Sequence, residues 1–152
     1  MFSPEVKKYI KRSVLCWLAT SSEDGMPNVS PKEAFTSYQD SYLIIANIAS
    51  PQTLRNIQQN NKVCVSFIDV FVQKGFQIKG TAEIVHKGAK DYDQMEAPLT
   101  EIVGGKFPFA SITKIKAEKI KPIIAPSYLL FPETTEESQA QSAIKTYHQF
   151  VK

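Results

Sequence analysis

Short apolar stretches separated by turn-forming residues run through most of the chain, and this pattern predicts β-strands. Residues 14–20 and 42–48 are apolar runs of strand length, and the first is followed by residues 21–25, which end in the hairpin-forming pair Asp-Gly. Residues 62–69 form another such run. In residues 76–84 the apolar side chains fall on one face, which is typical of an antiparallel strand with one side buried.

Two more strands complete this pattern. Residues 28–38 return from the first hairpin, but they contain Pro31, which cannot donate a hydrogen bond to a neighbouring strand. We therefore expect this strand to be bulged or to lie at a sheet edge. Residues 112–124 form the last long strand. Six strands joined by hairpins and a few helices predict a mainly β fold, a six-stranded antiparallel barrel with flanking helices.

Two later segments have helical patterns. Residues 88–103 look helical but are interrupted near Pro98. Residues 134–150 predict an amphipathic C-terminal helix, with Thr134 and Glu137 as a capping box at its start. The chain has no internal repeat and no linker, so residues 1–152 are expected to form a single domain.

The composition is that of an ordinary globular protein, with 43% hydrophobic and 22% charged residues and a net charge of +3. Its lysines are scattered, so we expect no nucleic-acid partner. No apolar run approaches the roughly 20 residues of a membrane span and no signal peptide is visible, which predicts a cytoplasmic protein without a membrane partner. Because Cys16, Cys64, His86 and His148 have no metal-ligand spacing, we expect neither a metal site nor a catalytic triad.

The chemistry is concentrated where a buried strand runs into the second of two Ser-Pro helix starts. Ser50-Pro51, like Ser3-Pro4, has a preferred N-cap residue followed by proline at the first helical position. The first turn of a helix offers unpaired N–H groups and the positive end of its dipole, which favour an anion. Thr53 adds a hydroxyl, and Arg55, one of two arginines beside sixteen lysines, has the planar group that grips phosphate. The alternative is an ordinary helix start, with Arg55 paired to a surface carboxylate.

The strand before this helix supplies a second candidate. Pro31 leaves neighbouring backbone groups without partners in the sheet, and the polar edge of a ring can use them. Lys32, the next residue, can point at a phosphate or at the negative edge of a reduced ring. The alternative is a solvent-facing lysine on an edge strand.

Six segments, in this order and spacing, carry a family resemblance, although none of them is specific alone. They are Leu18–Thr20, Asp24–Pro27, Val29–Lys32, Ser50–Asn56, Val63–Phe67 and Gly75–Ala82. Together they resemble the FMN-binding split-barrel family related to pyridoxamine 5'-phosphate oxidase. The resemblance covers roughly residues 3–126.

The resemblance implies a homodimer with two FMN sites, each lined by both subunits. It implies contacts with the flavin ring or ribityl chain at Asn28, Ser30 and Lys32, contacts along the ring at Ala46, Asn47 and Ile48, and a phosphate-binding turn at Ser50, Thr53, Arg55 and Asn56. A second subunit is also expected to cover apolar side chains such as Phe71, Phe76, Phe107 and Phe109.

Two departures from the family bear on the reaction. Relatives often carry a lysine where Gln52 and Thr53 stand here, so the charge of the phosphate would be compensated by Arg55 and Lys32. True pyridoxamine 5'-phosphate oxidases are longer and end in a segment with an Arg-x-His motif. No arginine follows Arg55 in this chain, and we therefore do not expect pyridoxamine phosphate oxidation.

The function implied by the resemblance is that of an FMN-dependent oxidoreductase acting on a small molecule. No catalytic residue is identified, because a flavin itself carries hydride and electron chemistry. Two alternatives stay open at this point. One is a non-catalytic flavin-binding protein that stores cofactor or senses redox state, and the other is a barrel that binds a deazaflavin or haem.

Overall fold

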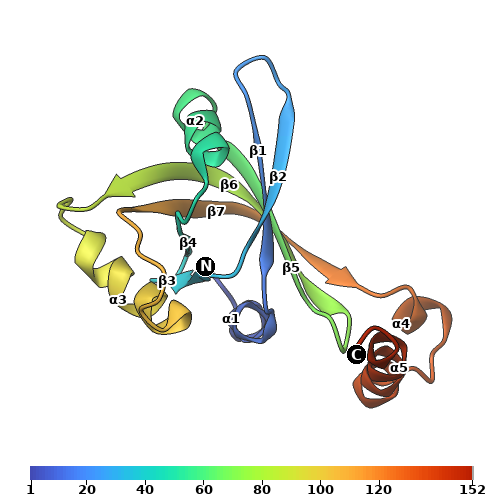
Figure 1. Cartoon of the computed structure of the whole chain (residues 1–152). Coiled ribbons are helices and arrows are strands. Elements are labelled where there is room, and N and C mark those ends of the chain that lie inside the picture. Colours follow the sequence, from blue (N-terminus) through green and yellow to red (C-terminus); the bar gives the residue numbers. More distant parts are fainter. Residues whose placement is uncertain (152) are drawn as a thin grey trace.

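The computed structural model describes residues 1–151, which form a curled antiparallel sheet flanked by helices (Figure 1). The strands are β1 (Cys16–Ser21), β2 (Pro27–Lys32), β3 (Phe35–Tyr38), β4 (Tyr42–Ala46), β5 (Lys62–Asp69), β6 (Lys74–His86) and β7 (Ser111–Ile124). The helices are α1 (Pro4–Arg12), α2 (Pro51–Gln59), α3 (Tyr92–Val103), α4 (Ser127–Leu130) and α5 (Glu136–His148). The mainly β antiparallel fold with flanking helices that the sequence predicts is confirmed, and its sheet forms a half-barrel.

The sheet has the order β2-β1-β5-β6-β7-β4-β3, so β2 and β3 are its two edges over the residues described. The sequence predicted one strand over residues 28–38, and the sheet has seven strands rather than six because this segment divides. Pro31 lies within β2 at the edge of the sheet, as expected for a residue without an N–H group. After Lys32 the chain leaves β1 and joins the other edge, where the Ala34 carbonyl accepts from the Ala46 N–H at 3.0 Å. The split in the barrel is therefore made by two consecutive residues, Glu33 and Ala34.

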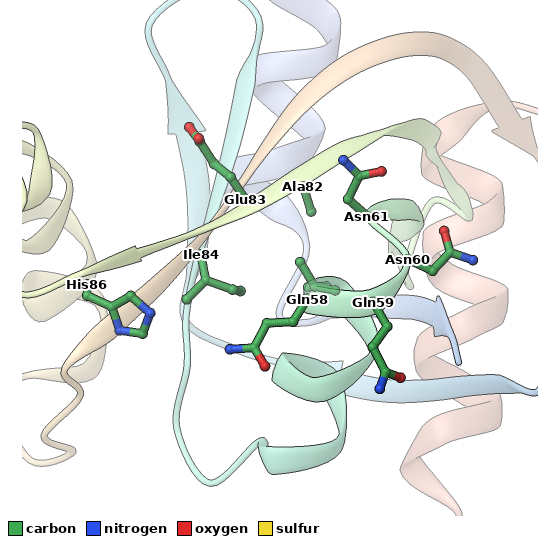
Figure 2. A pocket seen from close by; sticks show the side chains of 9 residues that line it. Gln58, Gln59, Asn60, Asn61, Ala82, Glu83, Ile84 and His86 are labelled. Carbon is green, nitrogen blue, oxygen red and sulfur yellow. The ribbon is translucent and has the colours of Figure 1, made fainter. Parts of the chain in front are cut away.

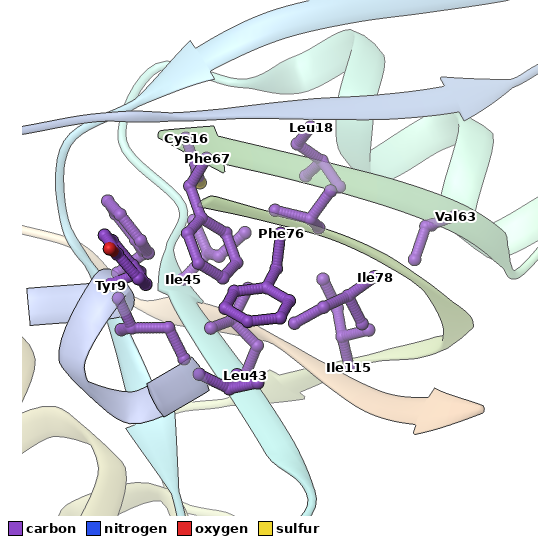
Figure 3. Packing of buried hydrophobic residues seen from close by; sticks show 14 of the residues in the cluster. Tyr9, Cys16, Leu18, Leu43, Ile45, Val63, Phe67, Phe76, Ile78 and Ile115 are labelled. Carbon is purple, nitrogen blue, oxygen red and sulfur yellow. The ribbon is translucent and has the colours of Figure 1, made fainter. Parts of the chain in front are cut away.

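The main hydrophobic core fills the curl of the sheet, with α1 packed against it (Figure 3). Phe67 and Phe76 lie on neighbouring strands with ring centroids 6.4 Å apart, and Tyr9 of α1 stands 6.1 Å from Phe76. Burial of the α1 face formed by Val6, Tyr9 and Ile10 agrees with its helical spacing. Phe76, expected at a subunit interface, is instead part of this core.

A smaller core cluster lies beneath α3, where Tyr92, Met95 and Leu99 pack on buried residues of β4 and β7. The predicted helix over residues 88–103 begins later, at Tyr92, and it continues through Pro98 rather than breaking there. Phe109, also expected at a subunit interface, is half-buried against this cluster. The cluster fixes the position of α3 beside the split of the barrel.

The C-terminal helix begins slightly later than predicted. Thr135 caps α5, and Ser138 completes a reciprocal capping box. The Thr134 hydroxyl instead donates to the Ser127 carbonyl at 3.1 Å. Only part of the predicted apolar face is covered, since Ala143 is buried and Ile144 is exposed. None of the helices in residues 1–151 is long and apolar enough to cross a membrane.

Candidate functional site

The site forms where the end of β2 meets the start of α2. Alternate residues of a strand share a face, so Ser30 and Lys32 both point toward this helix. The Lys32 ammonium donates to the Ser50 hydroxyl. The hydroxyls of Ser30 and Thr53 stand 3.4 Å apart. Four residues predicted at the flavin are thus brought together, and half-buried Asn28 lies on the same face of β2.

Lys32 is a buried cation, with only 8% of its surface exposed. It takes part in none of the ion pairs formed within residues 1–151. Burial lowers the pKa of its ammonium, an effect that the neighbouring Cys16 opposes. Burial also raises the pKa of the Cys16 thiol to about 12, so no thiolate compensates the lysine at neutral pH. A buried charge without an anionic partner is costly, and an anion from outside the chain would relieve that cost.

The start of α2 is open to such an anion. Ser50 is the N-cap residue, but its side chain does not cap the helix and its hydroxyl donates to the Ile48 carbonyl at 2.9 Å. The first backbone hydrogen bond of the helix comes from the N–H of Leu54, which leaves the N–H groups of Gln52 and Thr53 without helical acceptors. No acidic residue occupies the first turn. These N–H groups, the helix dipole and Lys32 all favour negative charge at one place.

Two of the predicted contact residues use their amides inside the protein. Asn47 accepts from the Thr113 hydroxyl at 2.7 Å and donates to the Ser111 hydroxyl at 3.2 Å, which ties the end of β4 to β7. Asn56 donates to the Thr20 hydroxyl at 3.0 Å and ties α2 to β1. Both side chains are buried and position the site rather than line it.

Arg55 lies on the exposed side of α2, and its guanidinium donates to the Gln52 side-chain oxygen at 2.8 Å. This differs from the alternative interpretation of the sequence, because the side-chain partner of Arg55 is an amide rather than a surface carboxylate. The structure does not bring Arg55 to Lys32. An arginine one turn inside a helix can face the ligand or the solvent, and the sequence alone does not distinguish the two directions.

A cavity of about 340 Å³ opens beside Lys32. One wall comes from the split of the barrel and the end of β4, including the predicted residues Lys32, Ala46 and Ile48. A second wall comes from α3 and the loop after it, namely Ile102, Val103 and Phe107. The sequence suggested Phe107 as a residue covered by a second subunit, and it gave no role to Ile102 or Val103. An apolar Phe107 shortly after Gly104-Gly105 was a usable signal for this wall. The arrangement suits a ligand with an apolar body and an anionic end.

A model of the pyridoxamine 5'-phosphate oxidase family matches residues 2–130 of the chain. The chain belongs to this family. The match includes all the residues that form the cavity and the start of α2, whereas α5 lies beyond it. No curated protein sequence matches the chain significantly.

Solved structures place the chain in the same fold. HupZ from Group A Streptococcus is 28% identical, with a TM-score of 0.67 over 79% of this chain and 92% of that protein. An FMN-binding protein from Syntrophomonas wolfei is 16% identical, with a TM-score of 0.65 over 77% of this chain and 82% of that one. HutZ, a haem storage protein from Vibrio cholerae, is 21% identical, with a TM-score of 0.65 over 80% of this chain and 94% of that one. The fold of the pyridoxamine 5'-phosphate oxidase family therefore accompanies more than one cofactor.

A second cavity of this family member, about 560 Å³, lies at the other end of α2 (Figure 2). It runs between β6 and the residues that end α2, and its lining is rich in neutral side-chain amides: Gln58, Gln59, Asn60 and Asn61. Its carboxylate, Glu83, is already paired with Lys114 at 3.2 Å. His86 ends β6 and is exposed. This cavity has no buried unpaired charge comparable to Lys32.

Proposed function

We propose that this protein binds FMN in the cavity beside Lys32 and acts as an FMN-dependent oxidoreductase on a small molecule. The observation that carries the proposal is the buried Lys32 ammonium at the uncapped start of α2. Family membership supports a flavin as the ligand, and the cavity volume of about 340 Å³ lies within the usual range for small-molecule sites, roughly 300–1,000 Å³.

The residues present fit the parts of FMN. The N–H groups of Gln52 and Thr53, together with Lys32 and Ser50, would hold the phosphate. Hydroxyls of Ser30 and Thr53 would meet the ribityl chain. Ala46 and Ile48 would give the cavity an apolar surface, and Arg55 would add positive charge near the phosphate. The other predicted residues have supporting roles: Asn28 lies further along β2, and Asn47 and Asn56 hold the end of β4 and α2 in place.

The lining favours a flavin over haem. Haem iron is held by histidine, cysteine, methionine or tyrosine side chains. The residues that line the cavity contribute none of these groups. Lys32 and the N–H groups of α2 instead suit a single phosphate at one end of the ligand.

A bound flavin would supply hydride and electron transfer, while the protein would orient the ring and exclude water. Lys32 is positioned to compensate negative charge on the ligand. We propose that the substrate is a small molecule other than pyridoxamine phosphate.

We propose that the protein works as a homodimer in the cytoplasm. The outer face of the sheet carries an apolar groove of about 350 Å³, lined by residues of β5, by Ile123 and by Val14, Leu15 and Trp17. Trp17 is 49% exposed there, so a large apolar ring is in contact with water unless a partner covers it. A second copy on this face would cover Trp17 and bring another subunit toward each flavin. Light scattering over a concentration series is expected to give a dimer, and a monomer that still binds flavin would contradict the shared site.

The experiment that tests the cofactor is the visible spectrum and mass of the small molecule that copurifies with the protein. We expect the spectrum and mass of FMN, whereas haem or a deazaflavin would contradict the proposal. Anaerobic mixing of the flavin-loaded protein with a reduced nicotinamide is expected to bleach the flavin absorption band. If reduced nicotinamides and common electron acceptors all fail, the storage or redox-sensing alternative replaces the enzyme.

A further inference from the structure

One wall of the cavity beside Lys32 is formed by the end of α3 and the α3–β7 connection, outside the residues assigned to FMN above. Ile102 and Val103 belong to the last turn of α3, and Phe107 lies in the loop that follows. Ala34 and Ala46 line the same cavity, and Val103 packs against the core cluster that contains them. Both alanines are small and buried, and the Ala46 N–H is bonded to the Ala34 carbonyl at 3.0 Å. The lining of the cavity therefore combines two small, buried alanines with larger apolar side chains.

The loop that carries Phe107 is held at both ends. Gly104 ends α3 in the left-handed conformation, with φ of 63°, and Gly105 follows with φ of 71°. Glycine adopts such angles without the penalty that a Cβ imposes. At the other end, the Tyr92 hydroxyl donates to the Phe109 carbonyl at 3.1 Å. Phe107 is thus presented by a loop with a defined course.

Phe107 is 55% exposed, although Phe109 of the same loop packs on the core cluster beneath α3. Phe107 lines the cavity, so part of its exposed surface is open to a ligand there. A large aromatic ring exposed inside a ligand cavity offers apolar area and a π-face to a flat ligand. Ile102, which is 47% exposed, also lines the cavity and extends that surface.

We propose that Phe107, flanked by Ile102, is the contact surface for the isoalloxazine ring, and that the α3–β7 loop positions this ring over Ala34 and Ala46. This inference rests on the proposed binding of FMN at the cavity. It assigns the two ends of the ligand to two different parts of the chain. The start of α2 with Lys32 binds the phosphate, and the end of α3 with its loop binds the ring.

The test compares Phe107→Ala with Phe131→Ala in the full-length protein. Phe131 is a matched control, because it is 56% exposed and follows α4 rather than lining the cavity. Each variant is titrated with FMN, riboflavin and lumiflavin. All three contain the isoalloxazine ring, but only FMN has the phosphate. We expect Phe107→Ala to weaken all three by about tenfold, and Phe131→Ala to change none of them. Phe107→Tyr, which keeps the aromatic face, is expected to restore most of the affinity.

The outcomes separate this inference from the proposed function. If the wild-type protein binds none of the three flavins, both fail. If it binds FMN and Phe107→Ala behaves like Phe131→Ala, the ring assignment fails while the proposed function stands. A loss confined to FMN would also overturn the ring assignment, since lumiflavin has only the ring. Light scattering is expected to give the same oligomeric state for all variants. A dissociated Phe107→Ala protein would show that Phe107 serves a subunit contact instead.

Discussion

Two helices of this protein, α1 and α2, start with the dipeptide Ser-Pro, but the serine side chain caps only α1. At α1, the Ser3 hydroxyl accepts from the Val6 N–H at 3.2 Å, and Glu5 adds negative charge to the first turn. At α2, the Ser50 hydroxyl turns back to the Ile48 carbonyl, and the first turn has no acidic residue. Both helices have nine residues and proline at the first position. The difference therefore lies in what surrounds the two serines.

The surroundings of Ser50 are set by the residues before it. Ala49 has a positive φ of 49°, a conformation that non-glycine residues seldom adopt. This places the Ile48 carbonyl within reach of the Ser50 hydroxyl, while Lys32 approaches from β2. Strained backbone tends to persist at functional sites, where the surrounding structure enforces it. We therefore interpret the start of α2, where the Ser50 side chain does not cap the helix, as part of a binding site.

The largest effect is expected from Lys32→Met, which removes the cation from the open start. Hydrogen bonds to charged groups contribute about 1.5–3 kcal/mol, so FMN affinity should fall about ten- to hundredfold. Riboflavin lacks the phosphate and should bind nearly as before. Lys119→Met, at an exposed lysine of β7, is the control and should change neither affinity. Equal losses for both flavins would place Lys32 at the ring instead.

The same variant should make the ligand-free protein more stable, by about 1 kcal/mol at neutral pH, because a buried unpaired charge is removed. The sign follows from the lowered pKa of Lys32. At pH values below the pKa of Lys32 in the folded protein, the ammonium is charged in both the folded and the unfolded state, and its burial destabilises the fold by the full amount. The cost disappears as pH rises toward the unfolded value of about 10.4. Denaturant unfolding at several pH values should show the wild type approaching Lys32→Met as pH increases, and a constant difference would contradict this account.

An intermediate effect is expected from the paired variants Ser3→Ala and Ser50→Ala. Loss of a capping serine costs about 1 kcal/mol, so Ser3→Ala should lower the free energy of unfolding by that amount and leave FMN affinity unchanged. Ser50 does not cap its helix, so Ser50→Ala should lower stability less and reduce FMN affinity by about fivefold. Denaturant unfolding and flavin titration measure the two quantities. If Ser3→Ala and Ser50→Ala change stability and FMN affinity equally, the two helix starts do not differ in function.

The two helix starts also show how far the sequence could lead. Proline and serine signals placed both helices correctly, because those signals act within a few residues. They could not reveal which serine caps its helix, because that depends on Lys32, eighteen residues away in the chain. Phe107 was missed as a site residue for the same reason, since its position follows from the packing of α3 on β4 and β7. Strand 28–38 was predicted as one element because nothing local marks the change of sheet edge after Lys32.

The smallest effect is expected at Arg55, the residue whose sequence context suggested the strongest phosphate contact. Its guanidinium is exposed and bonded to Gln52, so it acts on the start of α2 through solvent. Exposed charges contribute about 0.2–1 kcal/mol, and salt screens them. Arg55→Ala should therefore weaken FMN binding by about two- to threefold at low salt and less at high salt, without affecting riboflavin. Arg55→Lys should restore the affinity, because only the charge matters at this distance. A loss of tenfold or more that lysine does not restore would show that the guanidinium leaves Gln52 and grips the phosphate directly.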